Sequence, residues 1–231
     1  MRVAIMQPTY LPWIGYFALM DLVDTFIILD SVQFSKRSWQ QRNQIKTARG
    51  TKWLTVPVLS KGKREQLISV VKIDQSRNFS QNHIRTLEVN YRKAPYFKAY
   101  SESIFKLLKK HHESLSSLSV DLIILLRDLL GINTKLQLSS EFKVEGLKDD
   151  LLSDLCSRVG ATEYISPPGS KVYLDVSEAF ERQQTQIRYF DYKHPQYPQM
   201  FDDFVPYMSI IDLLFNCGPE SLSIIKKGIK I

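Results

Sequence analysis

The sequence predicts an α/β fold in which a doubly wound parallel sheet carries a helical insertion. Three observations support this prediction. Two short apolar runs flank a helical segment in residues 2–30, which is the pattern of a βαβ unit. Strand-like and helix-like segments alternate again from residue 132 to the end. Between these two parts lie three consecutive helical patterns, which we therefore interpret as an insertion.

Five core strands are expected, near residues 2–6, 25–29, 134–138, 163–166 and 186–191. Right-handed crossovers favour the order 3-2-1-4-5 of the Rossmann-type, nucleotidylyltransferase-like sheets. One helix is predicted to begin near Trp13. Four others are predicted at residues 148–159, 176–183, 209–216 and 219–226. Ligands of such sheets bind beyond the carboxyl ends of the strands. We expect the crevice between the first and third core strands, lined by residues 7–13, Ser139, Ser140 and residues 164–175.

The insertion, at about residues 53–131, is expected to hold a β-hairpin and three helices. Residues 53–58 and 67–73 run apolar or alternate on either side of a KGKREQ turn, which predicts two antiparallel strands. The helical patterns cover residues 78–93, 95–111 and 114–130, with apolar residues at three- and four-residue spacing. We therefore expect one α/β domain of 231 residues with this insertion.

Composition excludes several classes of protein. Apolar residues make up 44% and charged residues 24%, which is ordinary for a globular chain and unlike disorder or a coiled coil. No apolar run approaches the roughly 18 to 20 residues that span a bilayer. Met1 and Arg2 lead directly into the first strand and leave no room for a signal peptide. We expect no integral membrane segment and a cytoplasmic location.

Cys156 and Cys217 have no metal-ligand spacing and are predicted to be core residues, without a metal site.

Positive charge is concentrated in one stretch of the chain, which has a formal net charge of +7. Residues 31–64 contain nine Lys or Arg residues and no Asp or Glu, interleaved with aromatic residues. Such a stretch has the chemistry of a polyanion clamp with stacking surfaces. Lys36, Arg42 and Lys46 have aromatic or amide neighbours, so we expect them to bind a phosphorylated ligand. The alternative is a solvated basic loop.

The turn after the first strand supplies further candidates for ligand binding. Gln7, Tyr10 and Trp13 are expected to line the crevice. Gly15 would let a phosphate approach the helix N-terminus. The turn is similar in position to the His-x-Gly-His signature of nucleotidylyltransferase-like folds, but Trp13 and Tyr16 stand where the histidines would be. Nucleotide-binding geometry is therefore compatible with this turn, whereas nucleotidylyl transfer loses its phosphate donors; packing roles for Trp13 and Tyr16 remain open.

The loop after the fourth core strand is also expected to meet ligand. Gly169 and Lys171 suit a loop that closes over a phosphate, although the P-loop spacing is missing. Tyr173 and Asp175 would hydrogen-bond sugar hydroxyls.

Two titratable residues are candidates for a catalytic base. Asp30 ends the second core strand and His194 follows the fifth, so both belong at the carboxyl edge of the sheet. Asp30 can instead serve as a cap, and a His-Pro pair is common in structural loops. Ser209 and Asp212 are expected to cap and staple the final core helix.

Four long motifs support a family resemblance; they read QPTYLPWIGYF, ILDSVQFSKRSWQQRNQIK, WLTVPV and SIIDLLFNCG. With these motifs the sequence resembles, over nearly its whole length, the WbqC-like proteins, a bacterial family often encoded with surface-polysaccharide (O-antigen) genes. The resemblance implies an enzyme of bacterial envelope biosynthesis that acts on a sugar or another small molecule.

Three function classes remain open. The first is a transferase that adds an acyl or aminoacyl group to the amine of a nucleotide-linked amino sugar. The second is a nucleotidylyltransferase or amide ligase, in which ATP enters as a cosubstrate. The third is a nucleic-acid-binding protein, for which cations interleaved with aromatic residues are the sole support. The expected partner is a nucleotide-activated sugar or another small phosphorylated ligand, and a homo-oligomer is compatible with the sequence.

Overall fold

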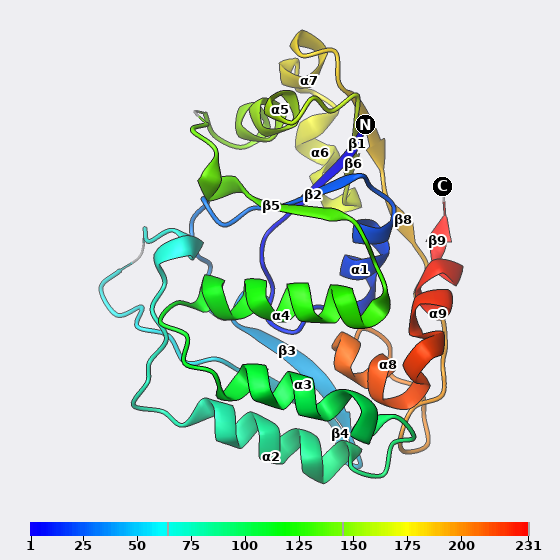
Figure 1. Ribbon diagram of the computed structural model, residues 1–231. Helices are drawn as coiled ribbons and strands as arrows, with labels where there is room; N and C mark the ends of the chain where they lie inside the picture. The colour runs from blue at the N-terminus through cyan, green and yellow to red at the C-terminus, as the bar shows by residue number, and fades with distance from the viewer. Residues whose placement is uncertain (64, 145, 231) are drawn as a thin grey trace.

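A five-stranded parallel sheet forms the centre of the protein (Figure 1). The computed structural model describes residues 1–63, 65–144 and 146–230. The sheet runs in the order β5-β2-β1-β6-β7, which is 3-2-1-4-5 in chain order and confirms the predicted topology. Its strands are β1 (Arg2–Met6), β2 (Thr25–Ile28), β5 (Lys135–Leu138), β6 (Glu163–Ser166) and β7 (Gln186–Tyr189).

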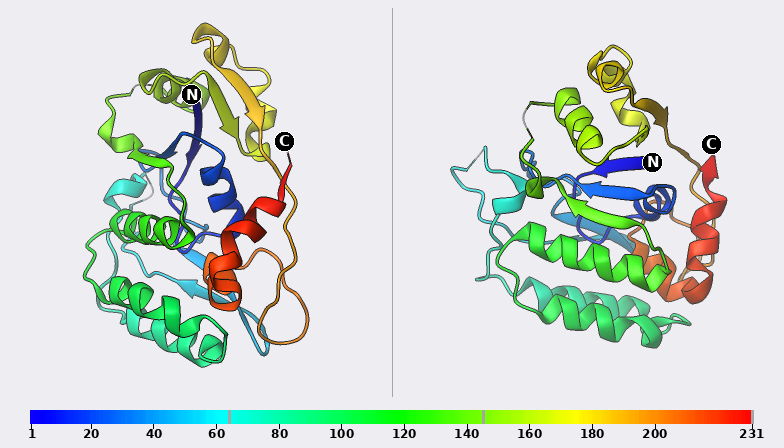
Figure 2. Two further views of the ribbon diagram at one scale, coloured as in Figure 1. Left: turned by 45° about the vertical axis from the view of Figure 1, so that its right-hand side comes forward. Right: turned by 45° about the horizontal axis from the view of Figure 1, so that its top comes forward.

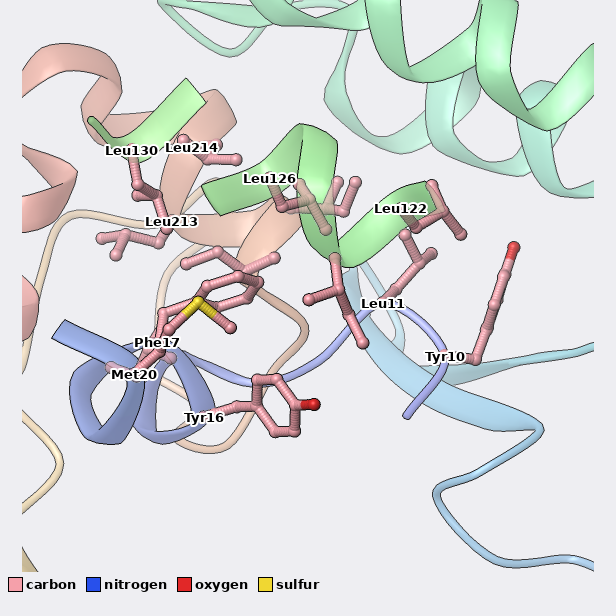
Figure 3. Packing of buried hydrophobic residues seen from close by; sticks show 14 of the residues in the cluster. Tyr10, Leu11, Tyr16, Phe17, Met20, Leu122, Leu126, Leu130, Leu213 and Leu214 are labelled. Atoms are coloured by element: carbon pink, nitrogen blue, oxygen red, sulfur yellow. The ribbon is translucent and has the colours of Figure 1, made fainter. Parts of the chain in front are cut away.

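Helices cover both faces of the sheet, as Figure 2 shows. One face packs on α1 (Ile14–Asp21), α4 (Leu115–Leu130), α8 (Ile210–Cys217) and α9 (Ser221–Lys227). The other packs on α5 (Asp149–Arg158), α6 (Lys171–Leu174) and α7 (Ala179–Arg182). Strand β2 is buried along its whole length, as a strand covered on both faces should be. In Figure 3, Phe17 and Met20 of α1 lie beside leucines of α4 and α8.

The insertion lies below the sheet in Figure 1, where α4, α3 (Phe97–Lys109) and α2 (Phe79–Tyr91) follow one another. These three helices confirm the predicted patterns. Among the described residues, the predicted pairing of residues 53–58 with 67–73 is found only as an isolated antiparallel bridge between Val58 and Ile73. The regular hairpin is formed instead by β4 (Gly50–Thr55) with β3 (Arg42–Thr47). Strand β3 lacks an alternating apolar pattern because polar side chains fill two of its buried positions.

The chain ends beside its last core strand. A short strand β8 (Asp191–Tyr192) pairs with β9 (Ile229–Lys230), so the predicted strand through residue 191 is divided in two. Cys156 and Cys217 are buried and free, which confirms their prediction as core residues. None of the helices in the described part of the chain has the length and apolar character needed to cross a membrane. The described residues also form four short 3-10 helices: η1 (Ile68–Val70), η2 (Ser139–Glu141), η3 (Pro168–Ser170) and η4 (Gly218–Glu220).

A buried carboxylate connects the insertion to the C-terminal helices. Asp212 on α8 is 0% exposed and accepts hydrogen bonds from the Tyr91 and Tyr197 hydroxyls, at 2.7 and 2.9 Å, and from Gln199 Nε2 at 2.7 Å. Burial raises the pKa of Asp212, and these hydrogen bonds oppose that rise. Ser209 caps α8, as predicted, by accepting the Ile211 amide.

Lys46 extends the same network and is not available as a ligand clamp. Its backbone amide donates to the Tyr91 hydroxyl at 3.0 Å, and its ammonium donates to the Phe201 and Asp203 carbonyls. The residue is 3% exposed. The expectation that Lys46 binds a phosphorylated ligand is therefore corrected, because backbone carbonyls already hold its charge.

His83 on α2 is a second buried titratable group. Its Nδ1 lies 2.8 Å from the Tyr10 hydroxyl, which removes Tyr10 from the residues available to a ligand, since Tyr10 is fully buried. Burial lowers the pKa of His83 to about 4, and a hydrogen bond with the Thr55 backbone opposes part of that shift.

Replacing Asp212 by Ala is expected to lower the free energy of unfolding by about 3 to 5 kcal/mol, because two hydroxyls and the Gln199 side-chain amide lose their buried partner. The matched control is Asp128→Ala on the exposed side of α4, where the paired carboxylate contributes less than about 1 kcal/mol. Urea unfolding of both variants measures the difference. Equal losses would show that the buried network does not hold the insertion.

The pH dependence of stability is expected to report His83. Because its folded pKa of about 4 lies below the unfolded value of about 6.5, the unfolded chain takes up more protons between these pH values. Stability therefore falls as pH decreases from about 6.5 to 4, by up to about 3 kcal/mol from this residue. Unfolding free energies at pH 7 and 4.5 should differ less in His83→Asn than in the wild type. Identical differences would contradict the assignment.

Candidate functional site

The topological switch point of the sheet lies between β1 and β6, where the strand order reverses. The connections that follow the strands on either side of this point run over opposite faces of the sheet. A cavity of about 530 Å³ opens there, beyond the carboxyl ends of the two strands. We call it the crevice. It is lined by Ile5, Met6, Gln7, Thr9, Leu29, Ser35, Ser38, Trp39, Gln40, Leu152, Tyr164, Pro167, Gly169, Ser170 and Tyr173. The expected position between the first and third core strands was wrong, because β2 separates these strands and Ser139 and Ser140 are not in the lining.

Two segments distant in sequence meet at this crevice. The turn after β1 contributes Gln7, whose side-chain carbonyl accepts a hydrogen bond from Gln40 Nε2 at 2.8 Å. The Tyr10 amide donates to the Trp39 carbonyl at 3.1 Å, which fixes the same turn against residues 35–40. Both segments belong to the motifs that carry the family resemblance. The loop after β6 supplies the opposite wall through residues 167–173.

The wall of the crevice is mostly apolar and carries no charge, with a few neutral polar groups. Among the described residues that line it, none is Lys, Arg, His, Asp or Glu. Trp39 is 49% exposed and offers a ring face at the crevice, while Gln, Ser and Thr side chains offer neutral hydrogen-bonding groups. Burial raises the pKa of Tyr164, and to a smaller degree that of Tyr173. Both phenols are therefore protonated near neutral pH, and the wall suits ligands rich in hydroxyl and amide groups.

A smaller cavity of about 280 Å³, which we call the inner pocket, adjoins the crevice. It shares Met6, Thr9 and Trp39 with the crevice. Its remaining lining residues are Trp13, Tyr16, Asn43 and Tyr207.

Two buried hydroxyl groups at the inner pocket lack partners. Thr9 Oγ1 and Tyr16 Oη are inaccessible to solvent, and the described residues offer neither a hydrogen bond. More than about 90% of buried polar groups in native proteins are paired, so such groups require an explanation. In Figure 3 the hydroxyl of Tyr16 points away from Phe17 and Met20. The sequence showed Tyr16 as an aromatic residue beside Gly15 and gave no sign that its hydroxyl is unpaired.

Trp13 packs against Gly15 and occupies the space that a phosphate was expected to use. A Cβ atom at residue 15 would lie 2.2 Å from the indole Cη2 of Trp13. The glycine therefore makes room for this ring, which corrects the expectation of a phosphate at Gly15. The indole also contacts the rings of Tyr207 and Tyr192, with centroids 5.6 and 5.5 Å away, and stacks with His194 at 6.2 Å.

His194 supports the inner pocket from behind and is not among the residues lining the crevice. Its Nε2 accepts the Tyr207 amide at 3.1 Å, and its Nδ1 lies 2.8 Å from the Pro195 carbonyl. An amide can only donate and a carbonyl can only accept, so His194 is neutral with its proton on Nδ1. Burial lowers its pKa, in agreement with that state. Tyr207, with a φ of 62°, is held in a conformation that non-glycine residues seldom adopt.

Asp30 lies at the carboxyl end of β2, as predicted, but its carboxylate is fully engaged. It is 2% exposed and accepts hydrogen bonds from Ser139 Oγ at 3.1 Å, the Ser140 amide at 2.9 Å and Ser140 Oγ at 2.8 Å. These bonds join the end of β2 to the start of η2. Asp30 does not line the crevice, although its neighbour Leu29 does. The catalytic roles of Asp30 and His194 stay predictions.

The basic residues expected to form one cation clamp lie in separate parts of the structure. Lys36 lines another cavity, of about 580 Å³, together with Arg37 and the first turns of α2. The Arg42 guanidinium lies 4.2 Å from the centroid of the Trp53 ring, which in turn packs on Trp39 at 5.2 Å. The structure thus places Lys36 and Arg42 apart from each other, and their binding of a phosphorylated ligand stays a prediction.

Of the ligand-binding residues predicted in the loop after β6, some line the crevice and others do not. Tyr173 and Gly169 line the crevice. Lys171 is exposed, with its ammonium 5.2 Å from the ring centroid of Tyr189, and Asp175 accepts a hydrogen bond from the Tyr189 hydroxyl. In the described residues, no group of three or more His, Cys, Asp or Glu side chains is placed to hold a metal ion.

The unpaired hydroxyl of Tyr16 leads to a prediction about stability. Replacing Tyr16 by Phe is expected to leave the free energy of unfolding unchanged or to raise it by up to about 1 kcal/mol, because no hydrogen bond is lost. The matched control is Tyr91→Phe, whose hydroxyl donates to Asp212 and accepts from Lys46, and which should cost about 1 to 3 kcal/mol. Urea unfolding compares the two. An equal loss in Tyr16→Phe would mean that its hydroxyl has a partner.

The sequence is similar to known proteins over a range that includes the three segments lining the crevice: the turn after β1, residues 35–40 and the loop after β6. Residues 7–224 match the WbqC-like protein family. A protein of Mycobacterium tuberculosis (strain ATCC 25618 / H37Rv), described as uncharacterized protein Rv1507c, is 39% identical over 222 residues, and the match covers 95% of each chain. No solved structure matches significantly. The chain therefore belongs to the WbqC-like protein family.

Proposed function

We propose that the protein is a transferase that holds a nucleotide-linked amino sugar in the crevice and adds an acyl or aminoacyl group to the sugar amine. Its setting would be bacterial surface-polysaccharide biosynthesis, as the genes that often accompany the family suggest. One observation carries the proposal: two motif segments, residues 7–13 and 35–40, converge with the loop after β6 on an uncharged crevice at the switch point of a doubly wound sheet.

The uncharged wall favours the nucleophile that this reaction needs. An amine attacks an acyl carbon only in its neutral form, and removal from water lowers the pKa of an ammonium group. A nearby carboxylate would oppose that effect, and the described lining of the crevice contains none. The amine nitrogen would form the new amide bond, the activating group would leave with the bonding electrons, and the amine would lose one proton.

Asp30 and His194 remain the candidate bases for that proton, and each would first have to break a hydrogen bond within the protein. Asp30 would have to release at least one of its bonds to Ser139 and Ser140 to accept a proton from a ligand. His194 would have to give up the Tyr207 amide, because its Nε2 carries the basic lone pair of the ring and that lone pair already accepts this amide. A phenol such as Tyr173, which lines the crevice, could relay the proton to water instead.

An ATP-dependent nucleotidylyltransferase or amide ligase is the second candidate, and the strand order of the sheet supports it. The chemistry of the crevice is less favourable to that reaction. Trp13 and Tyr16 stand in place of phosphate-binding histidines, and the described lining has no cation to stabilise the charge that develops on an attacked phosphate. Acyl transfer to a sugar amine leaves the diphosphate unchanged and does not need that stabilisation. The division of the cations among separate places likewise gives little support to a nucleic-acid groove.

Mass spectrometry of the reaction products tests the proposal. The protein is incubated with UDP- and dTDP-linked amino sugars and a panel of acyl and aminoacyl thioesters, with and without Mg-ATP. We expect an amide product without ATP, and a decrease of about 10-fold or more in kcat/KM for Gln7→Ala and Tyr173→Ala. The matched control is Arg182→Ala, an exposed residue of α7 paired with Asp150, which should keep wild-type rates.

Two outcomes would contradict the transferase. An amide that forms only with Mg-ATP would assign the protein to the ligase class. No amide with any donor, with or without ATP, would remove acyl transfer to a sugar amine from its functions.

A further inference from the structure

We infer that the inner pocket is the subsite for one neutral pyranose ring. The inference rests on the proposed function, because it assigns the sugar part of a nucleotide-linked sugar to the inner pocket and the nucleotide to the crevice, which is more open and lets the diphosphate keep its contact with water. The two cavities share Met6, Thr9 and Trp39, so a single ligand can extend from one into the other.

Aromatic rings form most of the wall of the inner pocket. Trp13, Tyr16, Trp39 and Tyr207 come from the turn after β1, from α1, from residues 35–40 and from the segment before α8. Flat apolar faces of this kind bind the C–H faces of a sugar ring by burial of apolar area. Trp13 is held in place on three sides by Gly15, His194 and Tyr192, so its face is fixed before any ligand arrives.

The unpaired hydroxyls supply the polar contacts that a sugar requires. Thr9 Oγ1 and Tyr16 Oη are the buried groups at this pocket without partners among the described residues. A hydroxyl can both donate and accept, and so can each hydroxyl of a pyranose. Asn43 offers a ligand less than these hydroxyls do, because both ends of its side chain already have partners. Its amide donates to the Leu11 carbonyl at 2.7 Å, and its side-chain oxygen accepts the Gln44 backbone amide at 2.7 Å.

Size and charge limit the occupant further. The volume of about 280 Å³ far exceeds the roughly 30 Å³ that one water occupies in the liquid, so a single water does not fill the pocket. It lies just below the roughly 300 Å³ at which pockets for drug-sized ligands begin, so it has room for one small ring. None of the seven described lining residues carries a charge, and burying a phosphate there without a counter-charge would be costly.

Calorimetry on the intact protein tests the subsite with four probes: UDP-N-acetylglucosamine, UDP-glucose, UDP and free N-acetylglucosamine. The variants are Tyr16→Phe and Thr9→Val, which each remove one unpaired hydroxyl while keeping the shape of the side chain. We expect each variant to weaken UDP-sugar binding by about 3- to 30-fold, the effect of one hydrogen bond, and to leave UDP binding unchanged. Tyr91→Phe, a buried tyrosine outside both cavities, is the matched control and should change neither.

The outcomes separate this inference from the proposed function. UDP-sugars that bind with equal affinity to wild type, Tyr16→Phe and Thr9→Val would overturn the subsite and leave the transferase standing. Free N-acetylglucosamine that binds and is lost in Tyr16→Phe, while UDP does not bind, would support the subsite and contradict the nucleotide-linked substrate. Equal weakening of UDP and UDP-sugar in Tyr16→Phe would place the nucleoside in the inner pocket and overturn the inference. Absence of binding by every probe would leave the pocket with water alone and would also overturn it.

Discussion

The geometry of the site depends on a buried hydrogen bond from the Asn43 side chain to the Leu11 carbonyl. Leu11 has a φ of 46°, which is unfavourable for a residue with a branched side chain. The 2.7 Å bond from β3 pairs the buried carbonyl that this conformation produces. The same turn carries Gln7, Thr9 and Trp13. One side chain of β3 thus fixes the backbone from which the crevice and the inner pocket are built.

The buried polar groups of the protein fall into two kinds. Asp212, Asp30, Lys46 and His194 are all engaged by hydroxyls, amides or carbonyls of the protein itself, and they join elements that are distant in sequence. The hydroxyls at the inner pocket are buried without such partners. Paired groups contribute to stability, whereas unpaired ones lower it unless a ligand or water completes them. Buried atoms without partners occur elsewhere too, for example Ser119 Oγ and Arg42 Nε, and the hydroxyls of Thr9 and Tyr16 differ from these in belonging to residues that line the inner pocket.

The sequence predicted the sheet well because the central strands β1 and β2 are buried and read as apolar runs, while the edge strands β5 and β7 were located by the alternation of strands with helices. It misplaced the hairpin because Asn43 and Lys46 occupy buried positions of β3 and conceal its pattern. The placement of Gln7, Trp13 and Tyr173 at the two cavities followed from their position at strand ends. For Asp30 and His194 the same rule predicted the edge of the sheet but not the serines and backbone amide that engage them. Those partners come from residues 13 to 110 positions away, which no local pattern reveals.

Gly15 shows how a residue without a side chain can be constrained by a neighbour two positions away. The Trp13 indole fills the volume beside it, so any larger residue at position 15 must displace a wall of the inner pocket. Positions 13 and 15 are therefore expected to vary together among related chains, with a side chain tolerated at 15 only where residue 13 has become small. Such paired replacement would change the shape of the cavity and leave its hydroxyls in place. The cavity would then differ in shape between chains whose buried hydroxyls are the same.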